Sequence, residues 1–240
     1  MELQKISILT PTYNRPYLLG FYLENIKCQD YPHHLLEVVI DDDGTDKFIP
    51  NNKFDYVKNI LEPIELKYMY YKNKRTIGEK RNNLVKNASS KIIINFDDDD
   101  IYQQSIISYC YYNLKSSSKI SLVGTNQMIF CFINDNFKIS AIQCNHKRLI
   151  HESGMMMTKK HWKSQGGFSK TSRGEGCNLI DNHNLDNIKL LECKNMLYCI
   201  CHDNNTIDKE RFNNENDNQE HMEISDYLKD LIIKSFKKTF

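Results

Sequence analysis

Apolar residues in the first 125 positions fall into short runs separated by amphipathic stretches. The apolar, β-branched runs predict five strands, at 5–10, 35–41, 64–71, 91–96 and 120–124. The stretches between them predict helices at about 16–28, 53–60, 77–88 and 102–115, the first of which starts at Pro16. Strands that alternate with helices in this way indicate βαβ units, and therefore a parallel sheet covered on both faces.

The pattern changes in the second half of the chain. Residues 127–157 read as consecutive strands, which predicts a mixed or antiparallel region. A short helix at 158–164 and a strand at 196–201 follow, and the polar stretch 203–221 has the composition of a flexible segment. From about 222 to 238, apolar positions fall on one helical face, which predicts a C-terminal helix docked on the core.

Composition narrows the class of protein. The chain has 240 residues and a net charge of +1, so no global field favours nucleic acid or a membrane surface. No apolar run approaches the roughly 20 residues of a transmembrane segment, and the N-terminus reads directly as a strand. The eight cysteines are scattered without a CxxC pair, which is typical of buried free thiols; a zinc site from Cys199, Cys201 and His202 would lack a second ligand pair. We therefore expect a cytoplasmic protein.

Polar and charged residues collect directly after four of the predicted strands. These segments are TPTYNRP (10–16), DDDGTD (41–46), NKRTIGEKRN (73–82) and DDDD (97–100). Ligands of open parallel sheets bind beyond the carboxyl ends of the strands, so we expect one site there. Neither GxGxxG nor GxxxxGK[ST] occurs. A bound nucleotide would therefore need its phosphates neutralised by basic groups and by a divalent metal such as Mn²⁺ or Mg²⁺ held on carboxylates.

In order and spacing, TPTYNRPYLL, VVIDDDGTD, IGEKRN and NFDDDDIY resemble a family 2 glycosyltransferase of the GT-A fold. SGMMMTKKHWKSQGGF, RGEG and CHDNNT extend the resemblance over roughly residues 4–206. It implies one α/β domain at 1–206, with a doubly wound, mostly parallel nucleotide-sugar-binding half (1–125) and a mixed acceptor-side half (126–206). Residues 207–240 would then form the flexible segment and the C-terminal helix.

The resemblance implies inverting, metal-assisted transfer of a sugar from a nucleoside-diphosphate sugar, with a UDP-sugar as first choice, to an acceptor hydroxyl of unknown kind. Two other functions remain open: a catalytically degenerate nucleotide-sugar-binding protein and a sugar nucleotidyltransferase. The second would need a Gly-rich basic loop after the first strand, which TPTYNRP is not.

The resemblance also implies roles for individual residues around the donor. Asp42 is the first choice for the hydrogen bond to uracil and Asp41 the alternative, while Asp43 would stabilise the turn at Gly44. The other residues expected to bind the nucleotide sugar are Thr10, Pro11, Tyr13, Arg15, Arg75, Lys80, Arg81, Asn82, Asp97 and Asp98.

The four consecutive aspartates are expected to have different roles. In an extended strand end, alternate side chains share a face, so Asp97 and Asp99 would point together and Asp98 away from them. The resemblance places the DxD motif on these three residues, with Asp97 at the ribose or the metal, Asp99 as a direct metal ligand and His202 as a further ligand. Asp100, three residues before a glutamine, can form a capping box for the next helix.

The resemblance implies that Glu175 is the general base that deprotonates the acceptor. The family's GED segment is here GEG, so Gly176 removes a second carboxylate, and Asp181 is kept as a reserve candidate.

Overall fold

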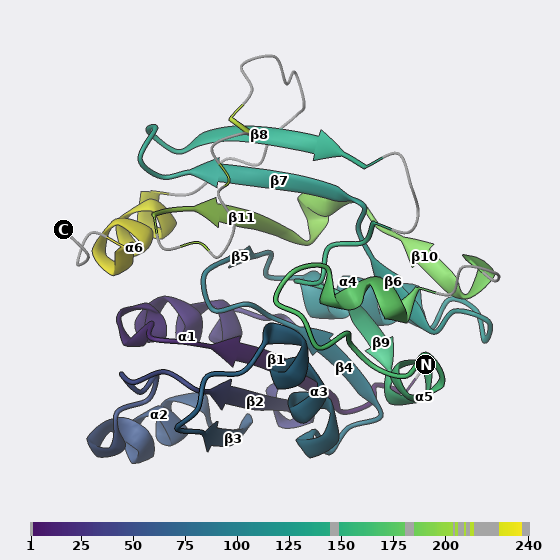
Figure 1. Cartoon of the computed structure of the whole chain (residues 1–240), viewed down its shortest axis with the longest axis horizontal. Helices are drawn as coiled ribbons and strands as arrows, with labels where there is room; N and C mark the ends of the chain where they lie inside the picture. The colour runs from purple at the N-terminus through teal and green to yellow at the C-terminus, as the bar shows by residue number, and fades with distance from the viewer. Residues whose placement is uncertain are drawn as a thin grey trace.

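The computed structural model describes residues 2–144, 149–180, 185–203, 205, 209, 212–213 and 226–236. Its central sheet has the strand order β10-β6-β9-β4-β1-β2-β3. These strands are β1 (Ile6–Thr12), β2 (Leu36–Asp42), β3 (Glu65–Tyr70), β4 (Ile92–Asn95), β6 (Leu122–Gly124), β9 (Met156–Thr158) and β10 (Ile188–Leu190). A second sheet, drawn above the central one in Figure 1, has the order β5-β11-β7-β8. Its strands are β5 (Ile101–Tyr102), β7 (Gln127–Phe132), β8 (Lys138–Gln143) and β11 (Leu197–Cys201).

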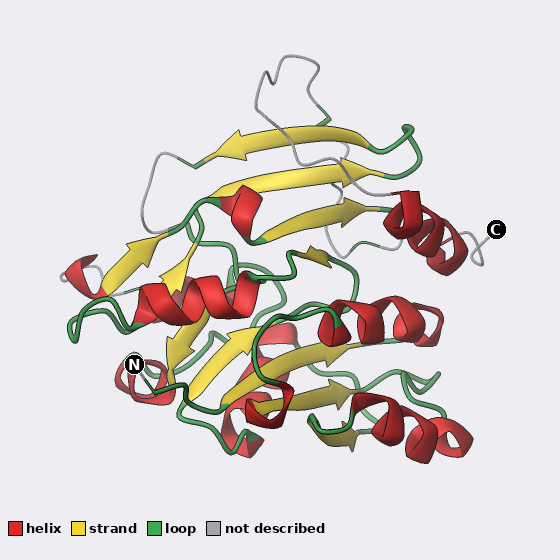
Figure 2. Ribbon diagram, turned by 180° about the vertical axis from the view of Figure 1, so that it is seen from behind, coloured by secondary structure: helices red, strands yellow, loops and turns green. Residues whose placement is uncertain are grey.

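Helices cover both faces of the central sheet, as the two opposite views in Figures 1 and 2 show. The α-helices are α1 (Leu19–Lys27), α2 (Phe54–Leu61), α3 (Ile77–Asn87), α4 (Ile106–Leu114), α5 (Lys159–Ser164) and α6 (Asp226–Phe236). Short 3-10 helices are η1 (Pro16–Leu18), η2 (His33–Leu35), η3 (Asn51–Lys53), η4 (Glu175–Leu179), η5 (Leu185–Asn187) and η6 (Cys193–Asn195).

Alternate residues of the central strands enter two separate hydrophobic cores. In β1, Ile6 and Ile8 pack into the core that includes α1, α2 and α4, whereas Leu9 packs into the core that includes α3. Both faces of β1, β2 and β4 are therefore buried, which explains why they appear in the sequence as continuous apolar runs. β1 pairs in parallel with β2 and β4, and β2 pairs in parallel with β3. The predicted mostly parallel α/β fold is confirmed.

The structure differs from some of the predicted elements. β9 does not continue an antiparallel series; it inserts into the central sheet between β4 and β6, antiparallel to both. The short strands β5 and β10 were not predicted. β5 also delays the helix expected at about 102, so that α4 begins only at Ile106.

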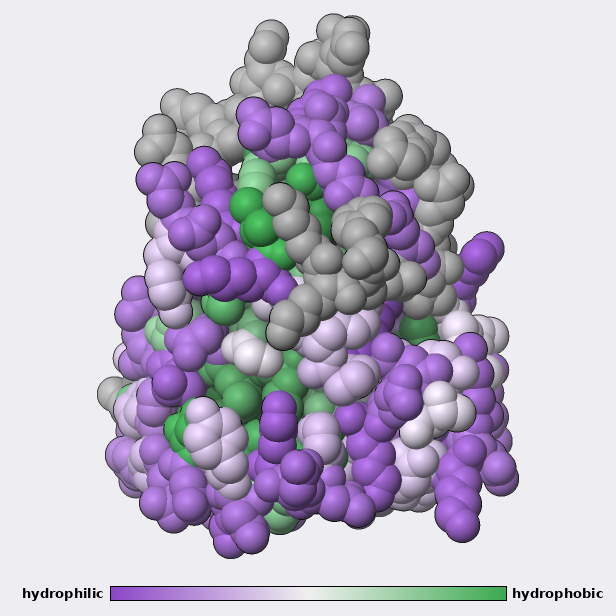
Figure 3. Space-filling model, turned by 90° about the vertical axis from the view of Figure 1, so that its left-hand side faces the viewer, coloured by the Kyte–Doolittle hydropathy of each residue, from purple (hydrophilic) through white to green (hydrophobic). Residues whose placement is uncertain are grey.

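The C-terminal helix α6 docks on α1, as its apolar face predicted. Ile232 and Phe236 are buried, and the rings of Phe236 and Phe21 lie 5.8 Å apart. Most of the segment predicted to be flexible lies outside the described residues. Figure 3 shows a surface that is mainly hydrophilic around a central group of apolar residues. Among the helices that the structure describes, none has both the length and the apolar character needed to cross a membrane.

Candidate active site

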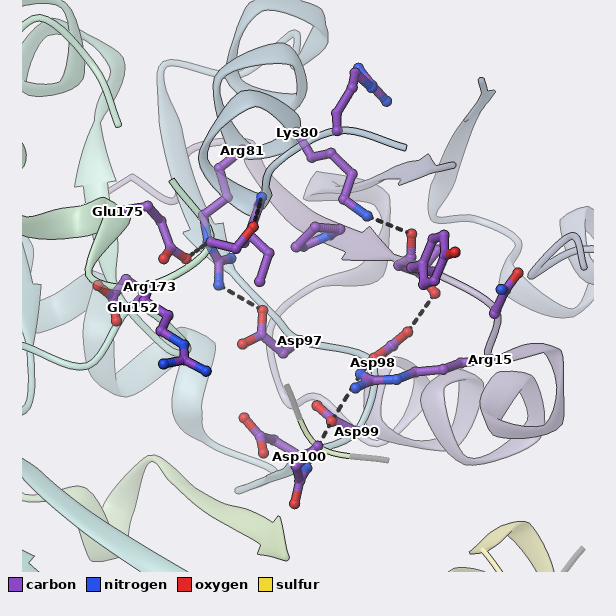
Figure 4. A pocket seen from close by; sticks show the side chains of 18 of the residues that line it. Arg15, Lys80, Arg81, Asp97, Asp98, Asp99, Asp100, Glu152, Arg173 and Glu175 are labelled. Atoms are coloured by element: carbon purple, nitrogen blue, oxygen red, sulfur yellow. Dashed lines mark hydrogen bonds and ion pairs between the residues drawn. The ribbon is translucent and has the colours of Figure 1, made fainter. Parts of the chain in front are cut away.

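A cavity of about 830 Å³ opens beside the carboxyl ends of β1 and β4. Its walls come from the loop after β1, the start of α3, the four aspartates and segment 172–175 (Figure 4). This volume lies within the range of small-molecule sites. The expected grouping of polar segments at one edge of the sheet is therefore found.

The loop after β1 supplies one wall. Pro11, Tyr13 and Arg15 line the cavity, as predicted, but Thr10 does not. β1 extends to residue 12, so that Thr10 is a fully buried strand residue whose hydroxyl is 2.8 Å from the Tyr22 hydroxyl of α1. Thr10 joins β1 to α1 instead of contacting a ligand.

The three aspartates at the end of β2 have distinct partners, and none lines the cavity. Asp42, rather than Asp43, stabilises the turn: it accepts hydrogen bonds from the backbone N–H of Gly44 at 2.9 Å and of Phe48 at 2.7 Å. It also accepts one from a tyrosine hydroxyl, so both of its oxygens are engaged. The expected turn role of Asp43 is thus wrong, and its carboxylate binds Lys80 instead, with an Nζ–Oδ1 distance of 2.7 Å.

Asp41 pairs with Arg75, which does line the cavity and stacks on the Tyr71 ring at 3.8 Å. The Asn83 side chain also donates to Asp41 at 2.7 Å. Both Asp41 and Asp42 are completely buried. The uracil contact expected from one of them stays a prediction.

Helix α3 aims two cations at the site because its start is fixed. Thr76 and Glu79 form a capping box, with each side chain bonded to the other's backbone N–H. Lys80 and Arg81 follow on the first turns, and both are buried and line the cavity. Besides Asp43, the Lys80 ammonium group donates to the carbonyl of Thr12 at 2.8 Å, which ties α3 to the end of β1.

Arg81 joins the two sides of the cavity. Its Nε donates to Glu175 Oε1 at 3.0 Å, and its Nη2 donates to Asp97 Oδ1 at 2.8 Å. Burial lowers the pKa of the guanidinium, but the two carboxylates raise it by more, so the net shift is upward. Its Nη1 is buried and has no partner among the described residues. One donor of this permanent cation is therefore available to a ligand.

Asn82 does not contact the cavity, contrary to its predicted nucleotide-binding role. Its amide nitrogen donates to the Phe168 carbonyl at 2.8 Å. Its amide oxygen accepts from the Phe168 N–H and from the Trp162 indole, each at 2.9 Å. Because adjacent residues of an α-helix point in different directions, the Asn82 side chain faces away from the cavity and holds the segment after α5.

We expect Asn82→Ala to lower the free energy of unfolding by about 2 kcal/mol, because the substitution leaves an indole N–H and two backbone groups without partners. Denaturant unfolding measures the change, and Asn59→Ala, at an exposed position of α2, serves as the matched control. UDP affinity should not change. A variant as stable as the wild type would contradict this assignment.

The four aspartates lie in a turn, so strand alternation does not apply to them. β4 ends at Asn95, and the turn spans 98–100. As a result, Asp98 and Asp99 converge on Arg15, with distances to its Nη1 of 2.6 Å and 2.9 Å, while Asp97 faces Arg81. The expected pairing of Asp97 with Asp99 against Asp98 is wrong. All four aspartates nevertheless line the cavity.

Asp100 does not cap a helix. It precedes β5, and the N-cap of α4 is Ser105. Its side chain is buried, and Oδ1 has no partner in the described part of the chain. Burial and the neighbouring Asp99 raise the pKa of Asp100 to about 7.

Asp99 and His202 come together as expected for metal ligands. His202 Nε2 is 3.2 Å from Asp99 Oδ2, and the Asn205 amide donates to the same oxygen at 3.3 Å. Burial raises the pKa of Asp99, but Arg15 and His202 lower it by more, so the carboxyl stays ionised. No group of three acidic, histidine or cysteine side chains in the described ranges is already arranged around one point. The oxygen-rich donors, including the unpartnered Asp100 oxygen, still fit Mn²⁺ or Mg²⁺.

The opposite end of the cavity carries Glu175 and a second carboxylate that the sequence did not indicate, Glu152. No sequence signal marks Glu152; in the structure it lies against Gly176, where an added Cβ atom would come within 2.9 Å of its Cγ. His151 and Lys209 also line the cavity and were not predicted. Asp181, the reserve base, lies outside the described residues. All eight cysteines are free, as expected, but Cys28 and Cys177 are exposed and Cys144 is half-buried, contrary to the expected burial.

Comparison with known proteins identifies the family. Residues 7–179 match the family described as Glycosyl transferase family 2. A Campylobacter jejuni GalNAc(5)-diNAcBac-PP-undecaprenol beta-1,3-glucosyltransferase is 29% identical over 102 residues, which are 40% of this chain and 30% of that protein.

Solved structures share the fold at low identity. The S. aureus TarS 1-349 complex with UDP has a TM-score of 0.65 at 17% identity, covering 82% of this chain and 61% of the other. The mannosyltransferase PcManGT from Pyrobaculum calidifontis, in complex with GDP-Man and Mn2+, has a TM-score of 0.60 at 16% identity, covering 80% and 57%. This chain thus spans less than two thirds of either structure. The likenesses confirm the expected GT-A fold, and because the family match extends over most of its length, the chain belongs to glycosyl transferase family 2.

Proposed function

We propose that the protein transfers a sugar, with inversion and metal assistance, from a UDP-sugar to an acceptor hydroxyl. The observation that carries this proposal is the division of the cavity. Cations and aspartates meet at one end, as a diphosphate with a metal requires, and two carboxylates lie at the other end, as an acceptor hydroxyl requires. TarS was solved with UDP, which supports the uridine nucleotide.

The donor's diphosphate would contact Arg75, Lys80 and Arg81, whose charges are balanced by Asp41, Asp43 and Asp97. Buried cations of this kind stabilise the charge that develops on the leaving diphosphate. Tyr13 and Pro11 would provide the apolar wall beside the nucleotide. A contact from Asp42 or Asp41 to uracil would require the carboxylate to give up a present partner, because both are buried and neither lines the cavity.

Asp99 and His202 would hold the metal, together with the Asp100 carboxylate, whose Oδ1 has no partner in the described part of the chain. Asp97, which faces Arg81, would lie at the ribose, and Asp98 next to the donor. A bound divalent cation supplies Lewis-acid stabilisation of the departing diphosphate. In the structure, Arg15 already partly neutralises Asp98 and Asp99, and a metal would take over part of that role.

Inversion needs a carboxylate on the acceptor side that takes the hydroxyl proton as the oxygen attacks the anomeric carbon. Glu175, the base proposed from the sequence, lies at this end of the cavity. The free state of all eight cysteines fits the proposed cytoplasmic location, where thiols stay reduced.

Incubation with a panel of UDP- and GDP-sugars, with Mn²⁺ or with EDTA, tests the proposal. We expect release of UDP from at least one UDP-sugar, at least about tenfold faster with Mn²⁺ than with EDTA, because the metal stabilises the leaving group. UDP binding without release, even with added glycan acceptors, would instead indicate a nucleotide-sugar-binding protein. Release of GDP alone would overturn the assignment of the uridine donor.

A further inference from the structure

The two carboxylates at the acceptor end differ in how they are held. Glu175 is buried, and its Oε1 is 3.0 Å from Arg81 Nε, so this lone-pair position is already engaged by a permanent cation. Glu152 is only half-buried and forms no ion pair with any residue of the described ranges. Its Oε1 accepts one hydrogen bond, from the Gly176 N–H at 3.1 Å. Glu152 therefore has more capacity to accept a proton from a ligand.

The backbone at Glu152 is fixed close to the reacting end of the site. Its carbonyl accepts from the side chain of Asn95, the last residue of β4, at 3.0 Å. Asn95 is separated from the four aspartates by Phe96 alone, and its own N–H and carbonyl pair with Met155 and Gly154, respectively. The segment carrying Glu152 is thus held to the same strand end as the proposed metal and donor site.

Gly176 provides the space that Glu152 occupies. A Cβ atom at position 176 would lie 2.9 Å from Glu152 Cγ and 3.0 Å from Oε1, so the Glu152 side chain would have to shift to make room for it. Segment 174–176 has a glycine, and no carboxylate, at its third position. The Glu152 carboxylate occupies the space beside that glycine.

We propose that Glu152 is the general base of the sugar transfer and that Glu175 is a positioning residue that orients Arg81. This inference rests on the proposed function. The acceptor oxygen forms a bond to the anomeric carbon, while the bond from that carbon to the diphosphate oxygen breaks and its electron pair leaves with the diphosphate. The acceptor proton passes to the Glu152 carboxylate.

The electrostatics agree with this division. Burial raises the pKa of Glu152, and the neighbouring Glu175 raises it further; His151 and Arg81 lower it by less. A carboxylate whose pKa is raised toward neutrality is a stronger base at the working pH.

The first test compares Glu152→Gln, Glu175→Gln and, as matched control, Glu192→Gln at an exposed position in the segment before β11. The donor is the UDP-sugar that the wild type hydrolyses fastest, with water as acceptor. We expect Glu152→Gln to lower UDP release at least about a hundredfold while UDP affinity with Mn²⁺ stays within threefold. The control should match the wild type. Wild-type release by Glu152→Gln would overturn the inference.

Azide distinguishes a general base from a residue with a structural role. This anionic nucleophile needs no deprotonation, so it can replace an acceptor only where the base is what has been lost. With Glu152→Ala, azide should form the glycosyl azide and raise UDP release at least about tenfold, whereas Glu175→Gln should gain nothing. Rescue of Glu175→Gln alone would assign the base to Glu175; the proposed function would then stand and this inference would fail. A wild type that neither binds UDP nor releases it would instead refute the proposed function.

Moving the carboxylate from position 152 to position 176 by mutation gives a second test that does not depend on azide. Glu152→Ala empties the space beside Gly176, and adding Gly176→Asp places a new carboxylate there. The double variant should release UDP at least about tenfold faster than Glu152→Ala. Gly176→Asp alone should be impaired, since it collides with Glu152. No recovery in a folded double variant that binds UDP would count against the proposal.

Discussion

Replacing Asp99 with alanine is expected to reduce UDP release on the order of a thousandfold, the largest effect of any single substitution at the site. Asp99 is the carboxylate on which a cation and a proposed metal ligand converge: Arg15 lies 2.9 Å away and His202 lies 3.2 Å away. Its removal takes away the negative charge for which a divalent metal would bind there. Of the two carboxylates that pair with Arg15, Asp98 and Asp99, only Asp98 then remains.

Two measurements separate loss of metal from loss of fold. Mn²⁺ affinity in the presence of UDP, followed by titration calorimetry, should fall at least about tenfold, and thermal unfolding should remain cooperative. Asp135→Ala, at an exposed turn between β7 and β8, removes the same charge away from the cavity and should leave both values unchanged. If Asp99→Ala binds Mn²⁺ as tightly as the wild type, Asp99 is not a metal ligand.

The same region shows how far the sequence leads. The four aspartates could be placed at the site because they follow a strand buried on both faces, and polar groups in that position have to face the open edge of a parallel sheet. Their individual directions could not be predicted. They depend on β4 ending at Asn95, and a turn at 98–100 breaks the alternation that a longer strand would give.

Long-range contacts account for the other differences. Asn82 and Arg81 are adjacent in the sequence, but the turn of α3 sends one toward Trp162 and the other toward Asp97. No local pattern marks Glu152, because its place at the site arises only when β9 inserts between β4 and β6. In the sequence, Gly176 marks the loss of a carboxylate. In the structure, it leaves room for the carboxylate of Glu152.

Substituting Gly78 with alanine is expected to lower kcat/KM for the UDP-sugar about a hundredfold, although Gly78 is not proposed to contact the donor. A Cβ atom there would lie 1.7 Å from the Ser169 carbonyl oxygen and 3.1 Å from the Glu175 Cβ. The start of α3 cannot retreat without breaking its capping box and moving the cations that follow it. The segment carrying Ser169 must move instead, and Glu175 moves with it, because the Ser169 N–H donates to the Glu175 carbonyl at 2.8 Å.

A displacement of about 1 Å in a positioning group is enough for a loss of this size, and the forced contact should also lower the free energy of unfolding by about 1–3 kcal/mol. Gly20→Ala is the matched control: this glycine lies in α1 with nothing within 4 Å of its added Cβ. The control should keep full activity and gain about 0.5–1 kcal/mol of stability, because alanine restricts the unfolded chain. Wild-type kinetics for Gly78→Ala would mean that the close contact between α3 and Ser169 does not position Glu175. If kcat/KM falls in Gly78→Ala but not in Gly20→Ala, the backbone packing at the start of α3 positions the carboxylates of the acceptor end.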